Sequence, residues 1–211
     1  MKAIAFIDAS NLFYGGKKSL GWSIDYQELL TYLNEKYGIG KAYFFGGVEV
    51  YRFDFDYLTY DSVPIRQLET YLVELIEHDG SRMSEAKLLL LDRHLKRVRF
   101  YALLEQFGYS LILKPVKTYR DEDGNQTRKA NCDVDMSFCM MKERESYSRA
   151  VVLSGDGDFL PVLKFLKKSG KEVIVLARSA RTAKEIKQFA GSNFRDFEYL
   201  RERLKRDEPE Q

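Results

Sequence analysis

The sequence predicts an α/β protein with a mainly parallel sheet, and two observations support this expectation. Short runs of apolar, β-forming residues alternate along the chain with longer segments of helical periodicity. Alternation of this kind is typical of parallel strands joined by helical crossovers. The chain has 211 residues, 45% of them hydrophobic, which is enough for one domain with a sizeable core.

The predicted elements follow in order and are bounded by residues that suit their ends. Asp25 suits the N-cap of the first helix, Pro64 the first turn of the second, and Gly108 the end of the third. Pro115 makes the end of the third strand an edge of the sheet or an exit from it. The predicted strands are residues 2–8, 41–51, 109–119, 150–154 and 172–177, and the predicted helices are residues 25–37, 64–78, 84–107, 132–146, 159–169 and 181–190.

The remaining segments complete the predicted organisation. Residues 120–131 are polar and predict a loop, in which the glycine and the acids do not match the spacing of a calcium-binding loop. Residues 194–200 predict a short extended or irregular piece, and the charged tail 201–211 is expected to fray. We therefore expect a single domain over residues 1–200 with a helical insertion at 51–107. The insertion is expected to project as a hairpin or to pack onto another subunit in a homodimer.

The composition excludes several classes of site. With only two histidines, His78 and His94, a three-histidine zinc site is excluded, and neither lies near a strand end as a Ser-His-Asp hydrolase would require. Cys132 and Cys139 match neither a metal-ligand spacing nor a disulfide framework. The sequence has no apolar run of about 18 residues and no signal peptide, so a cytoplasmic protein without a membrane span is expected. Any chemistry must then use carboxylates.

Charge is unevenly distributed although the net charge is only +2. Residues 51–81 hold seven acids and two arginines, a net of −5, whereas residues 164–206 hold thirteen Lys/Arg and five Asp/Glu, a net of +8. The basic part is compatible with a face that binds a polyanion, and equally with an ordinary solvated helical surface.

Two aspartates follow the fourth predicted strand in the stretch VVLSGDGDF. Asp156 and Asp158 are separated by one glycine and come directly before a helical pattern. In one interpretation they form a turn, with Asp158 as the N-cap of a helix that begins at Phe159 or Leu160. In the other they bind a metal, because Mg²⁺ prefers carboxylate oxygens and ligands bind beyond the carboxyl ends of parallel strands.

Other aspartates are expected at the same edge of the sheet. Asp8 ends the first strand, and the first and fourth strands of a parallel sheet point their carboxyl ends to the same edge. Asp8 and Asp156 are therefore expected to lie close together there. Asp133 and Asp135 open the helix after the polar loop and can reach this crevice, although they can also simply complement the helix dipole. Asp8 can likewise cap the segment that begins at Asn11. Clustered carboxylates repel one another unless a divalent ion binds, so the residues favour a metal-dependent phosphoryl-transfer enzyme.

Three motifs in this order resemble the NYN domain of the PIN-like nuclease superfamily, in its bacterial LabA-type branch. They are FIDASNLFYG at residues 6–15, KANCDVDMSF at 129–138 and VLSGDGDFLPVLKFLKKSGKEVIVLA at 152–177. The resemblance covers roughly residues 3–178 in motif order, and the last motif is the most specific. The helical stretch 51–107 has no counterpart among these motifs.

The resemblance implies a three-layer α/β/α PIN-like fold and a nuclease that acts on RNA, or less often on DNA. It implies Mg²⁺ or Mn²⁺ bound by the carboxylates of Asp8, Asp133 and Asp156, with Asp158 nearby. One position departs from the family pattern, because Cys139 stands where the family often has a further Asp. Asp135, four residues earlier on the same helix face, can substitute for it. A thiol is a poor Mg²⁺ ligand, so a preference for manganese or weak catalysis is expected.

The resemblance also implies residues that bind the substrate. Asn11 would orient Asp8 or contact a phosphate, and Ser154 would donate to a carboxylate or a phosphate. Lys129 would contact the nucleic-acid backbone. Basic residues of the C-terminal part are expected to flank the crevice and to follow the phosphates, namely Lys164, Lys167, Lys168, Arg178 and Arg181.

The predicted reaction is the metal-assisted hydrolysis of phosphodiester bonds in RNA. Asp8, Asp133 and Asp156 would hold one ion, while Asp158 or Asp135 would help to hold a second ion or position the water.

Two rival functions are considered, one from a different class and one enzymatic. A non-catalytic regulatory module would keep the fold and the basic face and bind RNA or protein partners without cutting, and the departure at Cys139 favours this modestly. A phosphatase of the haloacid dehalogenase type would need a second Asp two residues after Asp8, where this chain has Ser10.

Overall fold

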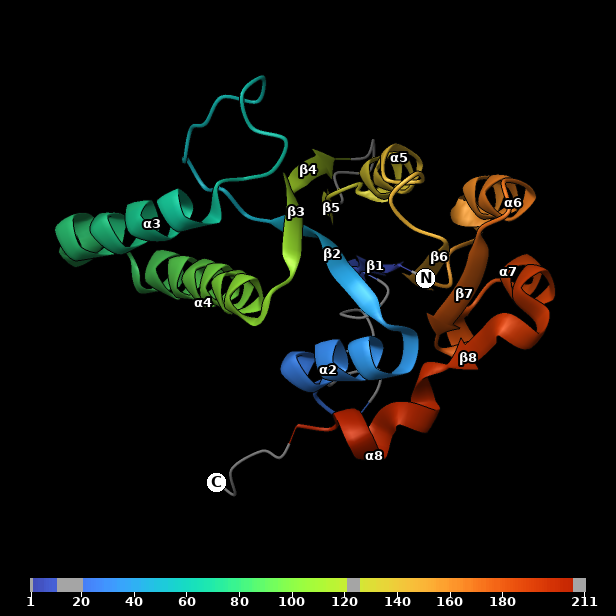
Figure 1. The fold of residues 1–211 in the computed structure, drawn as a ribbon. Helices are drawn as coiled ribbons and strands as arrows, with labels where there is room; N and C mark the ends of the chain where they lie inside the picture. Colours follow the sequence, from blue (N-terminus) through green and yellow to red (C-terminus); the bar gives the residue numbers. More distant parts are fainter. Residues whose placement is uncertain (1, 11–20, 121–125, 207–211) are drawn as a thin grey trace. The chain divides into compact units, whose positions relative to one another are not determined.

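The computed structural model describes residues 2–10, 21–120 and 126–206 (Figure 1). The chain divides into two compact units. Unit 1 is Met1–Phe45 together with Asp133–Gln211, and unit 2 is Gly46–Cys132. Within the described ranges, no helix is long and apolar enough to cross a bilayer.

Unit 1 is built around a parallel sheet. Its strands are β1 (Ala3–Asp8), β2 (Ile39–Val48), whose end extends into unit 2, β6 (Arg149–Leu153), β7 (Glu172–Ala177) and β8 (Phe194–Asp196). β1 pairs with β2 and β6, β6 also pairs with β7, and β7 with β8, all in parallel. Its helices are α2 (Tyr26–Tyr37), α5 (Asp133–Lys142), α6 (Leu160–Lys168), α7 (Lys184–Ala190) and α8 (Arg201–Leu204), with the 3₁₀ turns η3 (Gly157–Phe159), η4 (Ser179–Arg181), η5 (Gly191–Asn193) and η6 (Phe197–Leu200).

Helices cover both faces of this sheet, which explains why its strands read as continuous apolar runs. On one face, Phe6 of β1 stacks on Tyr43 of β2 and meets Tyr147, which follows α5. On the opposite face, Tyr26 of α2 packs edge-on against Phe44. Figure 1 shows α5 and α6 on one side of the strands and α2 and α8 on the other. The predicted three-layer α/β/α fold with a parallel sheet is therefore confirmed.

Unit 2 contains the helical hairpin and three strands. Its helices are α3 (Ile65–Asp79) and α4 (Glu85–Phe107), joined by the 3₁₀ turn η2 (Gly80–Arg82), and its strands are β3 (Ser110–Pro115), β4 (Lys117–Arg120) and β5 (Gln126–Lys129). The strands of the larger sheet are ordered β3-β2-β1-β6-β7-β8, so β3 ends at Pro115 on an edge strand, as Pro115 predicts. Gly108 closes α4 with a φ of 106°, a left-handed conformation that favours glycine.

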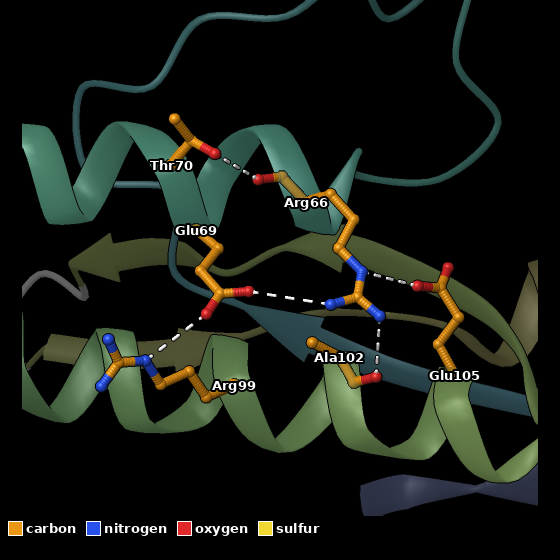
Figure 2. A network of polar contacts seen from close by, with 6 residues as sticks. All are labelled: Arg66, Glu69, Thr70, Arg99, Ala102 and Glu105. Carbon is orange, nitrogen blue, oxygen red and sulfur yellow. Dashed lines mark hydrogen bonds and ion pairs between the residues drawn. The ribbon is translucent and has the colours of Figure 1, made fainter.

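A polar network joins the two helices of the hairpin (Figure 2). The guanidinium of Arg66 lies 2.9 Å from the carboxylate of Glu105 and donates to the Ala102 carbonyl at 3.2 Å. Glu69 lies 4.0 Å from Arg66 and 3.4 Å from Arg99. These side chains are between 27% and 59% exposed, so each pair contributes little alone, but together they connect the facing sides of α3 and α4.

The expectation of one strand at 109–119 followed by a loop at 120–131 is wrong in two respects. The strand is divided at Val116, whose N–H donates to the Val48 carbonyl at 2.9 Å, giving β3 and β4. Residues 126–129 are not loop but strand β5, paired antiparallel with β4. The residues QTRK carry no apolar alternation, so a search for half-buried strands misses them.

Two predicted helices are shorter than expected. The helix predicted at 132–146 ends at Lys142, and the one predicted at 181–190 begins at Lys184. In the second case residues 179–181 form η4, and the Thr182 hydroxyl donates to the Arg178 carbonyl at 2.7 Å. Such hydroxyl–backbone bonds compete with regular helix at a terminus.

The C-terminal segment does not fray at its start, contrary to our expectation. Leu204 in α8 is fully buried, and its carbonyl accepts from the Asp25 N–H at 2.8 Å. Arg203 donates to Glu28 at 2.7 Å and to Glu35 at 2.6 Å, both on α2. The buried Leu204 and the ion pairs of Arg203 together dock α8 onto α2.

Replacement of Leu204 tests this packing. Leu204→Ala is expected to lower the free energy of unfolding by about 2–5 kcal/mol, because it removes a fully buried side chain and leaves a cavity. Glu202→Ala changes an exposed side chain on the same helix and is expected to stay within about 0.5 kcal/mol of wild type. Urea denaturation of both variants measures the difference, and equal midpoints would show that α8 is not docked.

Candidate functional site

Asp8 is a buried carboxylate at the carboxyl end of the central strand β1. Its side chain is 5% exposed, so its charge needs hydrogen-bond donors. Oδ1 accepts from the Ser10 N–H at 2.9 Å and from the Ser10 hydroxyl at 2.6 Å, and Oδ2 accepts from the Ser154 hydroxyl at 3.0 Å. Ala9 and Ser10 are helical, so Asp8 caps the segment that follows it. The capping role of Asp8 is compatible with a further role in binding.

Ser154 connects Asp8 to the turn that carries Asp156. The register Ile7 to Leu153 places Ser154 beside Asp8 at the same edge of the sheet. Ser154 is 2% exposed, and its hydroxyl also accepts from the Asp156 N–H at 3.3 Å. One hydroxyl therefore links the ends of β1 and β6, and its proton is directed at Asp8.

Asp156, rather than Asp158, is the capping residue of the turn. The Asp156 carboxylate accepts from the Asp158 N–H at 2.9 Å and so caps η3. The expectation that Asp158 is the N-cap is wrong, because this 3₁₀ turn precedes α6 and moves the cap two residues towards the strand. Both aspartates are exposed, in contrast to Asp8.

Asp133 and Asp135 leave α5 in different directions. Positions two residues apart on a helix point in directions that differ by about 200°. The carboxylates of Asp133 and Asp135 therefore cannot both face one ion from the same side of the helix. Asp135 shares its side with Cys139, four residues later, and Cys139 lies at the Tyr43 hydroxyl on β2. Asp133 lies on the other flank, and α5 also packs against η3 and α6. At most one of these two carboxylates can therefore face the turn that carries Asp156.

Cys139 lies in a polar cluster below the edge of the sheet. Burial raises the pKa of the Cys139 thiol to about 11, so it is protonated near neutral pH. Beside it, the Tyr43 hydroxyl donates to Glu143 at 2.9 Å and accepts from Lys41 at 2.6 Å. The hydrogen bond from Tyr43 lowers the pKa of Glu143, while burial raises the pKa of Tyr43. Since only the thiolate binds metals, Cys139 is not suited to replace a carboxylate ligand.

The predicted basic residues differ in how accessible they are. Lys164 and Lys167 on α6 are exposed, and the Lys167 ammonium lies 5.1 Å from the centre of the Phe189 ring. The Arg178 side chain is only 11% exposed and donates to Glu198 at 3.1 Å, so its charge is engaged within the fold. Lys129 ends β5 in unit 2, and its side chain and Asn11 lie outside the described part of the chain.

The described ranges contain no group of three or more Asp, Glu, His or Cys side chains placed to hold a metal ion. What they contain at the edge of the sheet is the pair Asp8 and Asp156, joined through Ser154. A pair of carboxylates is a donor set that fits Mg²⁺ or Mn²⁺, because Mg²⁺ is usually bound by one or two carboxylates together with waters and substrate phosphates.

Two residues of this site are missed by the sequence reasoning. From the sequence, Ser10 counts only against a phosphatase. In the structure its N–H and its hydroxyl both donate to Asp8. Its signal is local, because an Asp followed two residues later by a donor is a common turn pattern. Thr182 is missed for a different reason. It is 26 residues from Asp156 and packs on Gly155 only in the folded chain, where a Cβ on Gly155 would lie 2.6 Å from its hydroxyl oxygen.

A matched pair of glycine substitutions tests how tightly this turn is held. Gly155→Ala is expected to cost about 1–3 kcal/mol, because the new Cβ would also lie 2.9 Å from the Thr182 Cα, a backbone atom that cannot easily move. In Gly157→Ala the new Cβ would meet the end of the flexible Glu185 side chain at 2.6 Å, so the cost is expected to be smaller. Thermal unfolding of both variants measures the order, and a larger loss for Gly157→Ala would contradict it.

Several known proteins are similar to this chain in sequence or in structure. The chain is 25% identical to the low amplitude and bright protein LabA of Synechococcus elongatus, over 97% of this chain and 89% of that protein. A solved structure of a protein of unknown function from Vibrio parahaemolyticus is similar over 90% of this chain and 89% of its own, with a TM-score of 0.59 and 17% identity. The T5 D15 protein, co-crystallised with metal ions, aligns with 88% of this chain and 59% of its own, with a TM-score of 0.45 and 12% identity.

The family itself is shown by the sequence model of the NYN domain, which matches residues 2–198. This range contains all three motifs and the described acidic edge of unit 1. The chain belongs to the NYN domain family of the PIN-like nuclease superfamily.

Proposed function

We propose that this protein is a metal-dependent ribonuclease that hydrolyses phosphodiester bonds at the acidic edge of its parallel sheet. The observation that supports this best is the link from Asp8 through Ser154 to Asp156. The Ser154 hydroxyl holds the buried Asp8 carboxylate in place, while the Asp156 carboxylate stays exposed. This arrangement is suitable for binding a cation next to solvent. Membership of a nuclease superfamily supports the same chemistry.

The ion, Mg²⁺ or Mn²⁺, would be held by Asp8 and Asp156, with Asp133 as a third ligand from α5. When bound, such an ion activates a water and stabilises the charge that develops on the phosphoryl group. Asp135 is a weaker candidate, because it lies on the Cys139 side of α5. Asp158 is exposed beside Asp156 and would orient the water or bind the ion through it.

The remaining residues of the chain would orient and bind the substrate. Ser154 holds the Asp8 carboxylate in one orientation, and the Asp158 N–H does the same for Asp156. Lys164 and Lys167 are exposed on the helix that follows the turn, where they would contact phosphates. By family resemblance Asn11 and Lys129 would add further contacts. Arg178 would have to leave Glu198 to join them.

RNA is the substrate class that the family suggests, with DNA as the less frequent case. The basic segment 164–206, with a net charge of +8, is suited to a polyanion of either kind. We further propose that residues 1–200 form one NYN domain with the helices of 51–107 as an insertion. The match of the family model to residues 2–198 supports this division.

A module that binds RNA without cutting it is the second candidate function. Two observations favour it: the described ranges hold no group of three metal-ligating side chains, and the family's further carboxylate position is taken by the buried Cys139. The two functions make opposite predictions for cleavage and the same prediction for binding.

Cleavage of a labelled single-stranded RNA tests the proposal. Wild type with Mg²⁺ or Mn²⁺ is expected to cleave and to stop when EDTA is added. Asp8→Asn and Asp156→Asn are each expected to lose about 100-fold or more, because each removes a charged oxygen donor. Ser154→Ala is expected to lose about 10–100-fold, as residues that orient metal ligands do.

Asp79→Asn is the matched control, since it removes an exposed carboxylate at the end of α3 in unit 2. It is expected to cleave like wild type, and circular dichroism of all variants checks that they fold. Equal cleavage by Asp156→Asn and wild type would contradict the proposed site. RNA binding by wild type without any cleavage would establish the second function instead.

A further inference from the structure

Helix α5 is apolar on both sides. Its inner side chains, Met136, Cys139 and Met140, are buried against the sheet. Its outer side carries what we name the outer stripe: Val134, 72% exposed, Phe138, 65% exposed, and the half-buried Met141. These three positions follow the spacing i, i+4, i+7, so they lie on one face of the helix.

A surface helix of a globular protein normally has one apolar face, and a helix that is apolar on both faces is normally covered. The outer stripe faces solvent among the described residues. Contiguous exposed apolar patches, unlike single exposed apolar residues, are typical of interaction sites. The hairpin of unit 2, where the sequence suggested self-association, differs. Its exposed large apolar side chains are Leu89 and Leu103, both on α4 and fourteen residues apart.

We propose that the outer stripe binds the same stripe of a second copy of this chain, with the two α5 helices antiparallel across a two-fold axis. In such an isologous contact, if residue i of one copy touches residue j of the other, then residue j of the first copy touches residue i of the second. Each flank of the stripe therefore meets the same flank of the other copy. Phe138 lies at the axis and packs on Phe138 of the second copy, with Val134 and Met141 on either side.

The charges beside the stripe support this arrangement. Asp135 and Lys142 lie on the same flank of α5, seven residues apart, and Phe138 lies close to the middle of that interval. In the antiparallel pair, Asp135 of each copy therefore faces Lys142 of the other. Two opposite charges placed symmetrically about a central aromatic residue complement each other when the partner is an identical antiparallel helix.

Nucleic acid fits the same surface less well. Asp135, which is not among the three carboxylates proposed to hold the ion, stands beside the stripe and would repel a phosphate chain. The contact is small, since α5 has ten residues. An interface of this size falls at the low end of specific interfaces, so the dimer is expected to dissociate in the micromolar range, about 1–100 µM.

Sedimentation equilibrium of the full chain, without nucleic acid and from about 1 to 200 µM, tests the proposal. Wild type is expected to show a monomer–dimer equilibrium. Phe138→Glu is expected to weaken it about tenfold or more, because it places charges against each other at the axis. Phe165→Glu, which changes a 44% exposed phenyl ring on α6, is the matched control and is expected to dimerise like wild type.

Charge reversal tests the antiparallel register. Asp135→Lys and Lys142→Glu are each expected to weaken the dimer, because each places like charges opposite one another. The double variant restores opposite charges and is expected to recover the affinity of wild type. A monomer at all concentrations, or a dimer insensitive to Phe138→Glu, would overturn the proposal. Single variants that weaken association without recovery in the double variant would overturn the antiparallel register.

Discussion

The structure of the acidic edge depends on one constraint, namely that the charge of Asp8 is buried and must be satisfied. Ser10 and Ser154 supply three hydrogen bonds to this carboxylate. The Ser154 hydroxyl also accepts a hydrogen bond from the Asp156 N–H. The residue that stabilises the Asp8 carboxylate therefore also fixes where the turn with the exposed Asp156 begins. Because an unsatisfied buried charge costs several kcal/mol, this arrangement is tied to the stability of the sheet itself. Fold and candidate chemistry therefore share the same hydrogen bonds.

Much of this edge could be predicted from the sequence, because it follows from the spacing of apolar residues and from the order of strands and helices along the chain. Apolar runs alternating with helical segments imply parallel strands, and parallel strands end at one edge. An Asp at the end of β1 and another just after β6 must then lie at that edge, as Asp8 and Asp156 do. The bounds of α2, α3 and α4 were equally accessible, since Asp25, Pro64 and Gly108 mark their ends.

The features that the sequence did not reveal depend on contacts between distant segments. The hairpin of β4 and β5 is polar, and Leu204 is the one buried apolar side chain of α8, so neither element carries a periodic apolar signal. Which of Asp133 and Asp135 turns towards the edge of the sheet depends on how α5 is rotated on the sheet, and the burial of Met136 and Met140 decides that rotation. The exposure of Phe138 also could not be predicted from the sequence. An apolar residue on a helix is assigned to the core unless the segments packed around the helix are known.

The central claim is that Asp8 and Asp156 form a cation site, and calorimetric titration of Mn²⁺ and Mg²⁺ into the purified protein tests it most directly. Wild type is expected to bind the ion, and the double variant Asp8→Asn/Asp156→Asn is expected to lose that binding while keeping its fold by circular dichroism. Ser154→Ala should weaken binding by about 10–100-fold, as the loss of an orienting residue does. Equal binding by wild type and the double variant would contradict the claim, because the ion would then be held elsewhere.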